Sequence, residues 1–226
     1  MRESTAKLPS GLVVKLRGTT LEEDGVLFDD SNATRTFLDV CVQLLNACTV
    51  EVIETGPHSD VLTADGKLDW DKVLHGDLMA GALALRSLSF NDGHLYAIDI
   101  PCPQCKQMVN WHADLRMAAA HDDGDIIDYP MGDDVAQTIA AGGMFEADVA
   151  ERQVRFRLRT VGDMRSLQKL SPQEQSKARA IMFRKIIGTI ENIDNTNDYL
   201  PWLSKLESAD AQTLQDALDR YEPGID

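Results

Sequence analysis

A short alternating stretch with two cysteines constrains this chain more than any other part of its sequence. Between His94 and Leu115 the chain reads HLYAIDIPCPQCKQMVNWHADL, and apolar residues recur at alternate positions on both sides of Cys-Pro-Gln-Cys. A period of two is typical of a strand with one buried face. We therefore predict two half-buried strands joined by a turn, with Cys102 and Cys105 at the tip of the hairpin.

The spacing of these two cysteines indicates half of a metal site. Two intervening residues allow both sulfur atoms to face one point, which supplies two of the four ligands of a tetrahedral Zn²⁺ ion. His112, seven residues after Cys105, is a candidate third ligand, and His121 or a carboxylate is a candidate fourth. A redox dithiol is the alternative, although thioredoxin-type pairs lie where a strand enters a helix.

Length and charge restrict the class of protein. The 226 residues suffice for one large domain or two small ones. The net charge of −15 repels nucleic acid and anionic lipid and favours protein partners with basic surfaces. The sequence shows no secretory signal and no stretch of the roughly 18 apolar residues that span a membrane. We expect no nucleic acid, no membrane, and a reducing cytoplasm in which the four cysteines stay unbridged.

Hydrophobic periodicity predicts further elements after a loose, polar start. Residues 12–17 alternate as an amphipathic strand, and a helix that ends near Cys48 carries that residue and Cys41 on its apolar face. We expect both thiols in the core, where free cysteine behaves as a small apolar residue. Trp70 is a predicted core anchor, and Asp77 is the predicted N-cap of the next helix.

Two elements are predicted in the later part of the chain. Residues 145–160 alternate as a second hairpin that turns near Glu151 and Arg152. Ser171-Pro172-Gln173-Glu174 is a capping box with proline at the first helical position, and it opens a helix whose apolar stripe extends to Ile190. This combination of signals makes it the strongest helix prediction in the sequence.

Together these elements predict an α+β protein. Residues 1–165 form a mixed part with β-hairpins, a sheet and a zinc-ribbon-like Cys-x-x-Cys tip, and residues 166–226 form a C-terminal helical part. One continuous domain is the alternative, because no low-complexity linker marks a boundary.

Three arginines at alternate positions predict a basic edge on the second hairpin. Arg155, Arg157 and Arg159 share one face of a predicted strand. On an acidic chain this edge is a candidate partner-binding surface for a carboxylate-rich partner or for the chain's own acidic loop. The alternative is a solvated strand face with local ion pairs.

Motifs that carry enzyme chemistry are absent from the sequence. It contains no glycine-rich phosphate loop, no Gly-x-Ser-x-Gly elbow, no His-Glu-x-x-His and no dinucleotide-binding fingerprint. The five histidines are scattered, whereas a catalytic site needs convergent polar groups. We predict that the protein is not an enzyme and has no catalytic residues.

Several stretches, each weak alone, follow one another along nearly the whole chain in a recognisable order. They are LPSGLVVKLRG at 8–18, the helix up to Cys48-Thr49, Asp69-Trp70, Gly76-Asp77, Arg86, Cys102-Pro103-Gln104-Cys105, Asp114-Leu115, VRFRLRT at 154–160, and Gly224-Ile225-Asp226. In this order they resemble the baseplate hub assembly proteins of contractile-tailed bacteriophages, which are also called tail assembly chaperones.

The resemblance implies a non-catalytic protein that binds hub or tail subunits in the host cytoplasm while the phage baseplate assembles. The alternatives are a stoichiometric component of the virion baseplate and, from other classes, a zinc-ribbon regulator or a thiol redox protein. Members of this family typically carry a second Cys-x-x-Cys after the last helix, which would complete a zinc site with Cys102 and Cys105. Residues 1–226 contain no second pair, so either that pair lies beyond residue 226 or this member has lost it. Within residues 1–226, zinc, the implied cofactor, has half of its ligands.

Overall fold

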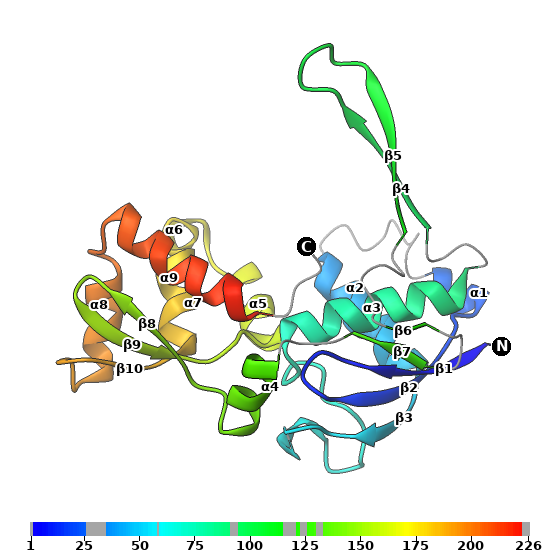
Figure 1. Ribbon diagram of the computed structural model, residues 1–226, viewed down its shortest axis with the longest axis horizontal. Helices are drawn as coiled ribbons and strands as arrows, with labels where there is room; N and C mark the ends of the chain where they lie inside the picture. Colours follow the sequence, from blue (N-terminus) through cyan, green and yellow to red (C-terminus); the bar gives the residue numbers. More distant parts are fainter. Residues whose placement is uncertain are drawn as a thin grey trace.

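Mixed sheets and helices make up the protein, which confirms the α+β class. Figure 1 shows two bodies side by side and a two-stranded hairpin that stands away from the first of them. Among the described residues, no helix is long and apolar enough to cross a membrane. The computed structural model describes residues 2–25, 35–57, 59–90, 95–114, 121–122, 126–129 and 133–222.

The first body is built on a five-stranded sheet with the order β3-β2-β1-β7-β6. Its strands are β1 (Glu3–Lys7), β2 (Val13–Arg17), β3 (Thr49–Glu54), β6 (His121–Asp122) and β7 (Ile126–Asp128). Neighbouring strands pair antiparallel except β1 and β7, which are parallel. Strand β2 confirms the predicted amphipathic strand. The prediction of a loose start is wrong, because β1 buries Ser4 and Ala6, which are too small to give a strong apolar alternation.

Helices α2 (Phe37–Cys48) and α3 (His75–Ser89) pack against this sheet and against each other. The first body also contains the short helix α1 (Leu21–Asp24) and a 3₁₀ turn at Ser59–Val61. The core predictions are confirmed, since Cys41, Cys48 and Trp70 are all buried. A Cβ atom added to Gly81 of α3 would lie 3.3 Å from the Trp70 ring. The absence of a side chain at Gly81 therefore makes room for this ring.

The second body surrounds a three-stranded sheet with the order β10-β9-β8. The strands are β8 (Phe145–Val149), β9 (Arg152–Phe156) and β10 (Ile187–Ile190). The helices are α4 (Asp133–Ala140), α5 (Val161–Gln168), α6 (Pro172–Gln175), α7 (Ala178–Ile186), α8 (Tyr199–Leu203) and α9 (Ser208–Tyr221), with a 3₁₀ turn at Thr196–Asp198. Strands β8 and β9 confirm the second predicted hairpin, and Ala150 and Glu151 form its turn with φ of 49° and 60°.

The helix predicted from the capping box to Ile190 is wrong in its extent. The box itself is present, because the Ser171 hydroxyl accepts the Glu174 N–H and the Glu174 side chain accepts the Ser171 N–H. The helix then breaks between α6 and α7, and Ile187–Ile190 forms β10 against β9. Two isoleucines and a threonine favour a strand there, Gly188 disfavours a helix, and Ile187 and Ile190 remain buried.

Buried apolar residues divide into two clusters, one in each body. The first extends from Ala6 to Tyr129 and includes Val161, and the second extends from Val135 to Leu218 and includes Leu74. The β8–β9 hairpin therefore shares its core with the C-terminal helices. The predicted parts, 1–165 and 166–226, do not coincide with these clusters, because they separate that hairpin from the helices that cover it.

The third part is the hairpin formed by β4 (Leu95–Pro101) and β5 (Met108–Asp114), which we call the arm. The strands pair antiparallel from Leu95 opposite Asp114 to Pro101 opposite Met108, which confirms the first predicted hairpin. Each strand contacts mainly the other strand, and Figure 1 shows the arm extending away from the first body. Residues 100–111 of the arm are exposed on both faces, with Cys102 partly exposed.

Candidate functional site

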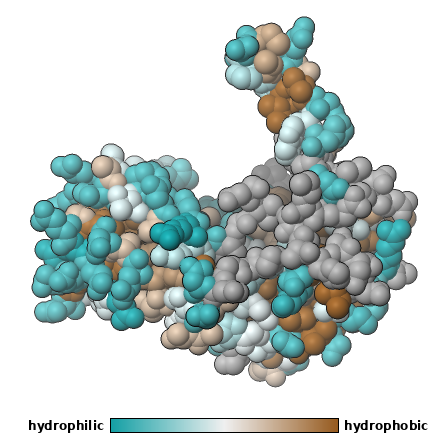
Figure 2. All heavy atoms as spheres, viewed as in Figure 1, coloured by the Kyte–Doolittle hydropathy of each residue, from teal (hydrophilic) through white to brown (hydrophobic). Residues whose placement is uncertain are grey.

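One face of the arm is apolar. Residues directly opposite each other in antiparallel strands share a face. Ile100 is opposite Val109, and Trp111 lies two residues further along β5 on the same side. These three residues, named here the apolar face, are 43%, 51% and 50% exposed. Figure 2 shows hydrophobic residues gathered on the shaft of the arm.

The exposure of the apolar face differs from the sequence prediction. The alternation predicts a face buried within the protein, and this is wrong for Ile100, Val109 and Trp111. Alternation shows that the two faces of a strand differ, but it does not show what covers the apolar one. Large apolar residues that gather on a surface mark a site of interaction with another molecule.

The opposite face of the arm is more polar. Asp99 is opposite Asn110, and the Asn110 Nδ2 donates to Asp99 Oδ1 at 2.8 Å. His112 lies on the same side of β5, as does Met108 near the tip, which is 61% exposed. The arm is thus an amphipathic ribbon with its apolar face open to solvent.

Backbone hydrogen bonds shape the tip around Cys102. Its N–H donates to the Gln107 carbonyl at 2.8 Å, and its carbonyl accepts the Lys106 N–H at 2.9 Å. Lys106 has a φ of 61°, in the left-handed region used by tight turns. The N–H groups of Cys105 and Gln104 and the Cys105 side chain donate to the Cys102 sulfur, and they lower the pKa of its thiol. These contacts favour the thiolate form of Cys102.

The predicted metal ligands are only partly brought together. His112 lies on β5 four residues beyond Met108, about 13 Å along the strand, which is too far from the thiols for a shared metal ion. The side chain of His121 lies outside the described residues. Within the described part of the chain, no three His, Cys, Asp or Glu residues are grouped to hold a metal. Cys102 and Cys105 thus fit half of a zinc site.

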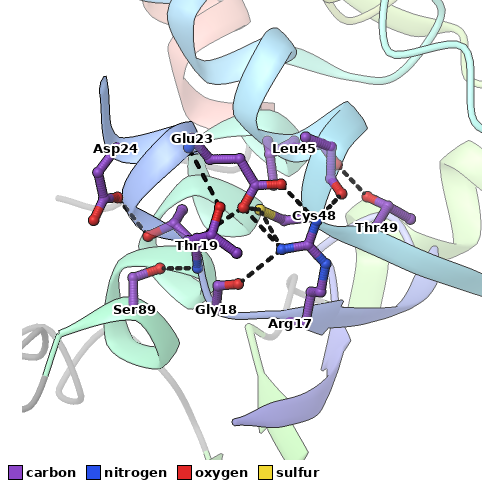
Figure 3. Close-up of polar contacts among 11 residues, drawn as sticks. Arg17, Gly18, Thr19, Glu23, Asp24, Leu45, Cys48, Thr49 and Ser89 are labelled. Atoms are coloured by element: carbon purple, nitrogen blue, oxygen red, sulfur yellow. Dashed lines mark hydrogen bonds and ion pairs between the residues drawn. The ribbon is translucent and has the colours of Figure 1, made fainter. Parts of the chain in front are cut away.

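The other two cysteines lie in the core of the first body. Figure 3 shows Cys48 beside Arg17 and Glu23, with the Arg17 guanidinium 3.9 Å from its sulfur. Arg17 donates to both carboxylate oxygens of Glu23, at 2.8 and 2.5 Å, and holds the pKa of Glu23 at about 2. Burial raises the pKa of Cys41 and of Cys48 to about 11. These thiols stay protonated, which suits packing rather than metal binding.

The three arginines of the predicted basic edge each face a carboxylate of the same chain. Ion pairs join Arg155 to Glu146 (3.3 Å), Arg157 to Asp163 (2.7 Å), and Arg159 to Glu222 and Asp219 (3.4 Å for the latter). These contacts agree with the alternative of local ion pairs. Partner binding by this edge stays a prediction, and a partner would have to compete with these carboxylates.

Comparisons with protein-family models, with curated proteins and with solved structures find no match.

Proposed function

We propose that this protein binds hub or tail subunits of a contractile-tailed phage through the apolar face of its arm, without catalysing a reaction. The observation that carries the proposal is an exposed, tryptophan-containing face on a hairpin that stands away from the body. The resemblance of the sequence to baseplate hub assembly proteins supplies the kind of partner. The place of action is the host cytoplasm during baseplate assembly.

The stability of the arm supports a role in binding. A two-stranded hairpin is marginally stable in water because it has no core of its own. Strands β4 and β5 contact mainly each other, so the bodies add little to their stability. Burying the exposed halves of Ile100, Val109 and Trp111 against a partner would contribute on the order of 3 kcal/mol. A partner would thus stabilise the arm while it covers the apolar face.

Charge restricts the surface that this face can meet. The chain has a net charge of −15, and Asp99 lies on the arm itself. A partner surface with an apolar centre would cover the apolar face, and a basic rim around that centre would attract this acidic chain over long range. Nucleic acid and anionic membranes carry the wrong sign of charge, so neither is the proposed partner.

Affinity capture from phage-producing cells tests the proposal with two matched variants. Val109→Ser/Trp111→Ser removes two residues of the apolar face, and Met108→Ser/Asn110→Ser changes their neighbours on the opposite face. We expect hub or tail subunits to be captured by the wild type and the second variant. The first variant should bind about 30-fold more weakly, because roughly 2 kcal/mol of burial is lost. Equal capture by all three proteins would contradict the proposal.

A permanent place in the finished baseplate is the second candidate function. It is favoured by the same exposed face, since a permanent neighbour would bury Ile100, Val109 and Trp111 equally well. Quantitative mass spectrometry of purified particles separates the two roles. Several copies per particle indicate a structural component, whereas capture from lysate without retention in particles indicates an assembly chaperone.

A further inference from the structure

We propose that the free edge of strand β3 is a second binding surface, which binds an extended peptide segment of another protein that carries both basic and apolar side chains. This surface belongs to the first body and is separate from the arm, so the inference goes beyond the proposed function. A chain with both surfaces could hold two partners, or two parts of one partner, at the same time.

Strand β3 is paired along one side. It stands at the end of the strand order β3-β2-β1-β7-β6, and within the described residues β2 is the strand that pairs with it. An edge strand presents free backbone N–H and C=O groups, to which an extended segment can pair. The edge therefore supplies the backbone part of a peptide-binding surface.

Two β-bulges place apolar side chains at this edge. The pairing of β3 with β2 shifts register twice, and the shifts leave Val50 and Ile53 without an opposite residue. Bulges re-aim side chains and interrupt regular pairing. Val50 and Ile53 are 50% and 47% exposed, and Figure 2 shows hydrophobic residues gathered where Figure 1 draws β3. A segment bound here is thus held by contacts with these side chains as well as by short stretches of backbone pairing.

A pocket beside the edge suits one side chain of such a segment. It has a volume of about 180 Å³ and is lined by residues 49–52 of β3, by residues 66–68 and by Trp70. Sites for small molecules are larger, at about 300 Å³ or more, so a single peptide side chain is the better fit. The Trp70 Nε1–H is buried and donates to no acceptor within the described residues. A side chain that carries a hydrogen-bond acceptor into the pocket would give this donor a partner.

Charge favours a basic segment as the occupant. The exposed carboxylates of Glu51 and Glu54 lie on β3, and Lys15, which is opposite Glu51, forms its ion pair with Glu3 at 2.7 Å. Lysine or arginine side chains of a bound segment would meet the two β3 carboxylates. A second copy of this chain would bring the same two carboxylates to the edge, and like charges opposite each other destabilise a strand pair. The occupant is therefore a segment of another protein rather than a second copy.

Selection from a library of displayed peptides of random sequence tests the inference. The bait is the full chain with Val109→Ser/Trp111→Ser, so that the apolar face of the arm selects no peptides and the result is independent of the proposed function. We expect enriched peptides in which lysine or arginine alternates with apolar residues. Enrichment of acidic peptides, or of no peptide, would overturn the inference.

Fluorescence anisotropy of an enriched peptide then measures its binding to variants of the bait. Val50→Ser/Ile53→Ser should weaken binding about tenfold, because the exposed halves of two apolar side chains are no longer available for burial. Full affinity of this variant, with an unchanged circular dichroism spectrum, would contradict binding at the β3 edge.

A matched pair of charge variants tests the basic character of the segment. Glu51→Gln/Glu54→Gln should weaken binding of the same peptide about fivefold at physiological salt, because two exposed ion pairs are lost. Asp148→Asn/Glu151→Gln removes two exposed carboxylates from the second body and should leave binding unchanged. Equal loss of affinity in both variants would show that net charge, rather than the β3 edge, attracts the peptide.

Hydrogen exchange on the bait itself tests the location of the peptide without any change to the edge. The bound peptide should slow the exchange of backbone amides in residues 49–54. Protection elsewhere, with β3 unchanged, would overturn the inference. Light scattering covers the remaining occupant, because a dimer of the bait that Val50→Ser/Ile53→Ser abolishes would show that a second copy occupies the edge instead.

Discussion

Asp77 is almost completely buried in the first body, where its carboxylate accepts the backbone N–H of Ser10 at 2.9 Å. The sequence predicts Asp77 as a helix N-cap, but Leu74 holds that position and Asp77 is the third residue of α3. This hydrogen bond instead connects the turn after β1 to the start of α3. This contact joins residues 67 positions apart, so local spacing could not reveal it.

Asp77→Asn should change how stability depends on pH. Burial raises the pKa of Asp77 from 3.8 to about 6, so the folded protein binds more protons than the unfolded chain between these values. The free energy of unfolding therefore falls by roughly 2 kcal/mol as pH rises from 4 to 7. The amide oxygen of the substituted side chain would accept the same hydrogen bond without ionising. Urea unfolding of Asp77→Asn at several pH values should therefore give a free energy of unfolding that no longer falls over this range.

Asp210 offers a matched control for that experiment, because it is also the third residue of a helix, α9, and is only partly buried. Asp210→Asn should leave the difference between pH 4 and pH 7 as in the wild type. If the free energy of unfolding depended on pH in the same way in the wild type and in Asp77→Asn, burial would not raise the pKa of the Asp77 carboxyl.

The four cysteines should react with a maleimide in two distinct pairs. Cys105 is exposed and Cys102 is partly exposed with a lowered pKa, whereas burial raises the pKa of Cys41 and Cys48 to about 11. In the native protein with excess chelator, we expect rapid labelling of the first two alone, read by peptide mass spectrometry. In denaturant all four should react. Native labelling of Cys41 at the rate of Cys105 would be inconsistent with a closed core.

At the scale of elements, sequence patterns predict well where signals are local and strong. Strand β2, helix α2 and both hairpins follow from apolar periodicity, and the capping box at Ser171 marks the start of α6. Strand β1 is missed because its inward side chains are small, and β10 because its apolar residues also fit a helical stripe. Pairing with a distant strand determines that both segments form strands, and a short stretch of sequence does not reveal that partner strand.

Helix α3 and helix α9 are connected through the segment that follows β9. The His75 N–H donates to the Arg159 carbonyl at 2.9 Å, and the Val161 N–H donates to the Val73 carbonyl at 2.9 Å. The Arg159 guanidinium then donates to Glu222 at the end of α9. The side chains of Arg159 and Glu222 are 16% and 7% exposed, so this ion pair lies largely out of water.

Arg159→Met should destabilise the second body by about 3 kcal/mol, because it leaves the Glu222 carboxylate buried without its cation. Adding Glu222→Gln should recover a large part of that loss. Arg155→Met is the matched control, since Arg155 and Glu146 are about half exposed and such a pair contributes less than about 1 kcal/mol. Urea unfolding measures all three variants. Equal stability of Arg159→Met and Arg155→Met would contradict the role of the buried pair.

At the scale of the whole molecule, two bodies carry an arm whose function the sequence reveals only in part. The Cys102–Cys105 pair and the hairpin around it are visible in the sequence, because both are local patterns. The exposure of Ile100, Val109 and Trp111 is not visible, since the same alternation describes a strand covered by its own protein. The division of the core also depends on long-range packing, which places the β8–β9 hairpin with the C-terminal helices.

Hydrogen exchange on the captured complex tests the role of the arm most directly. Backbone amides of β4 and β5 should exchange rapidly in the free protein, because this isolated hairpin opens easily. With the captured hub or tail subunit bound, we expect strong protection of residues 95–101 and 108–114 and little change in α7 and α9. Protection confined to another surface, such as the β3 edge, with the arm still exchanging rapidly, would contradict binding through the apolar face.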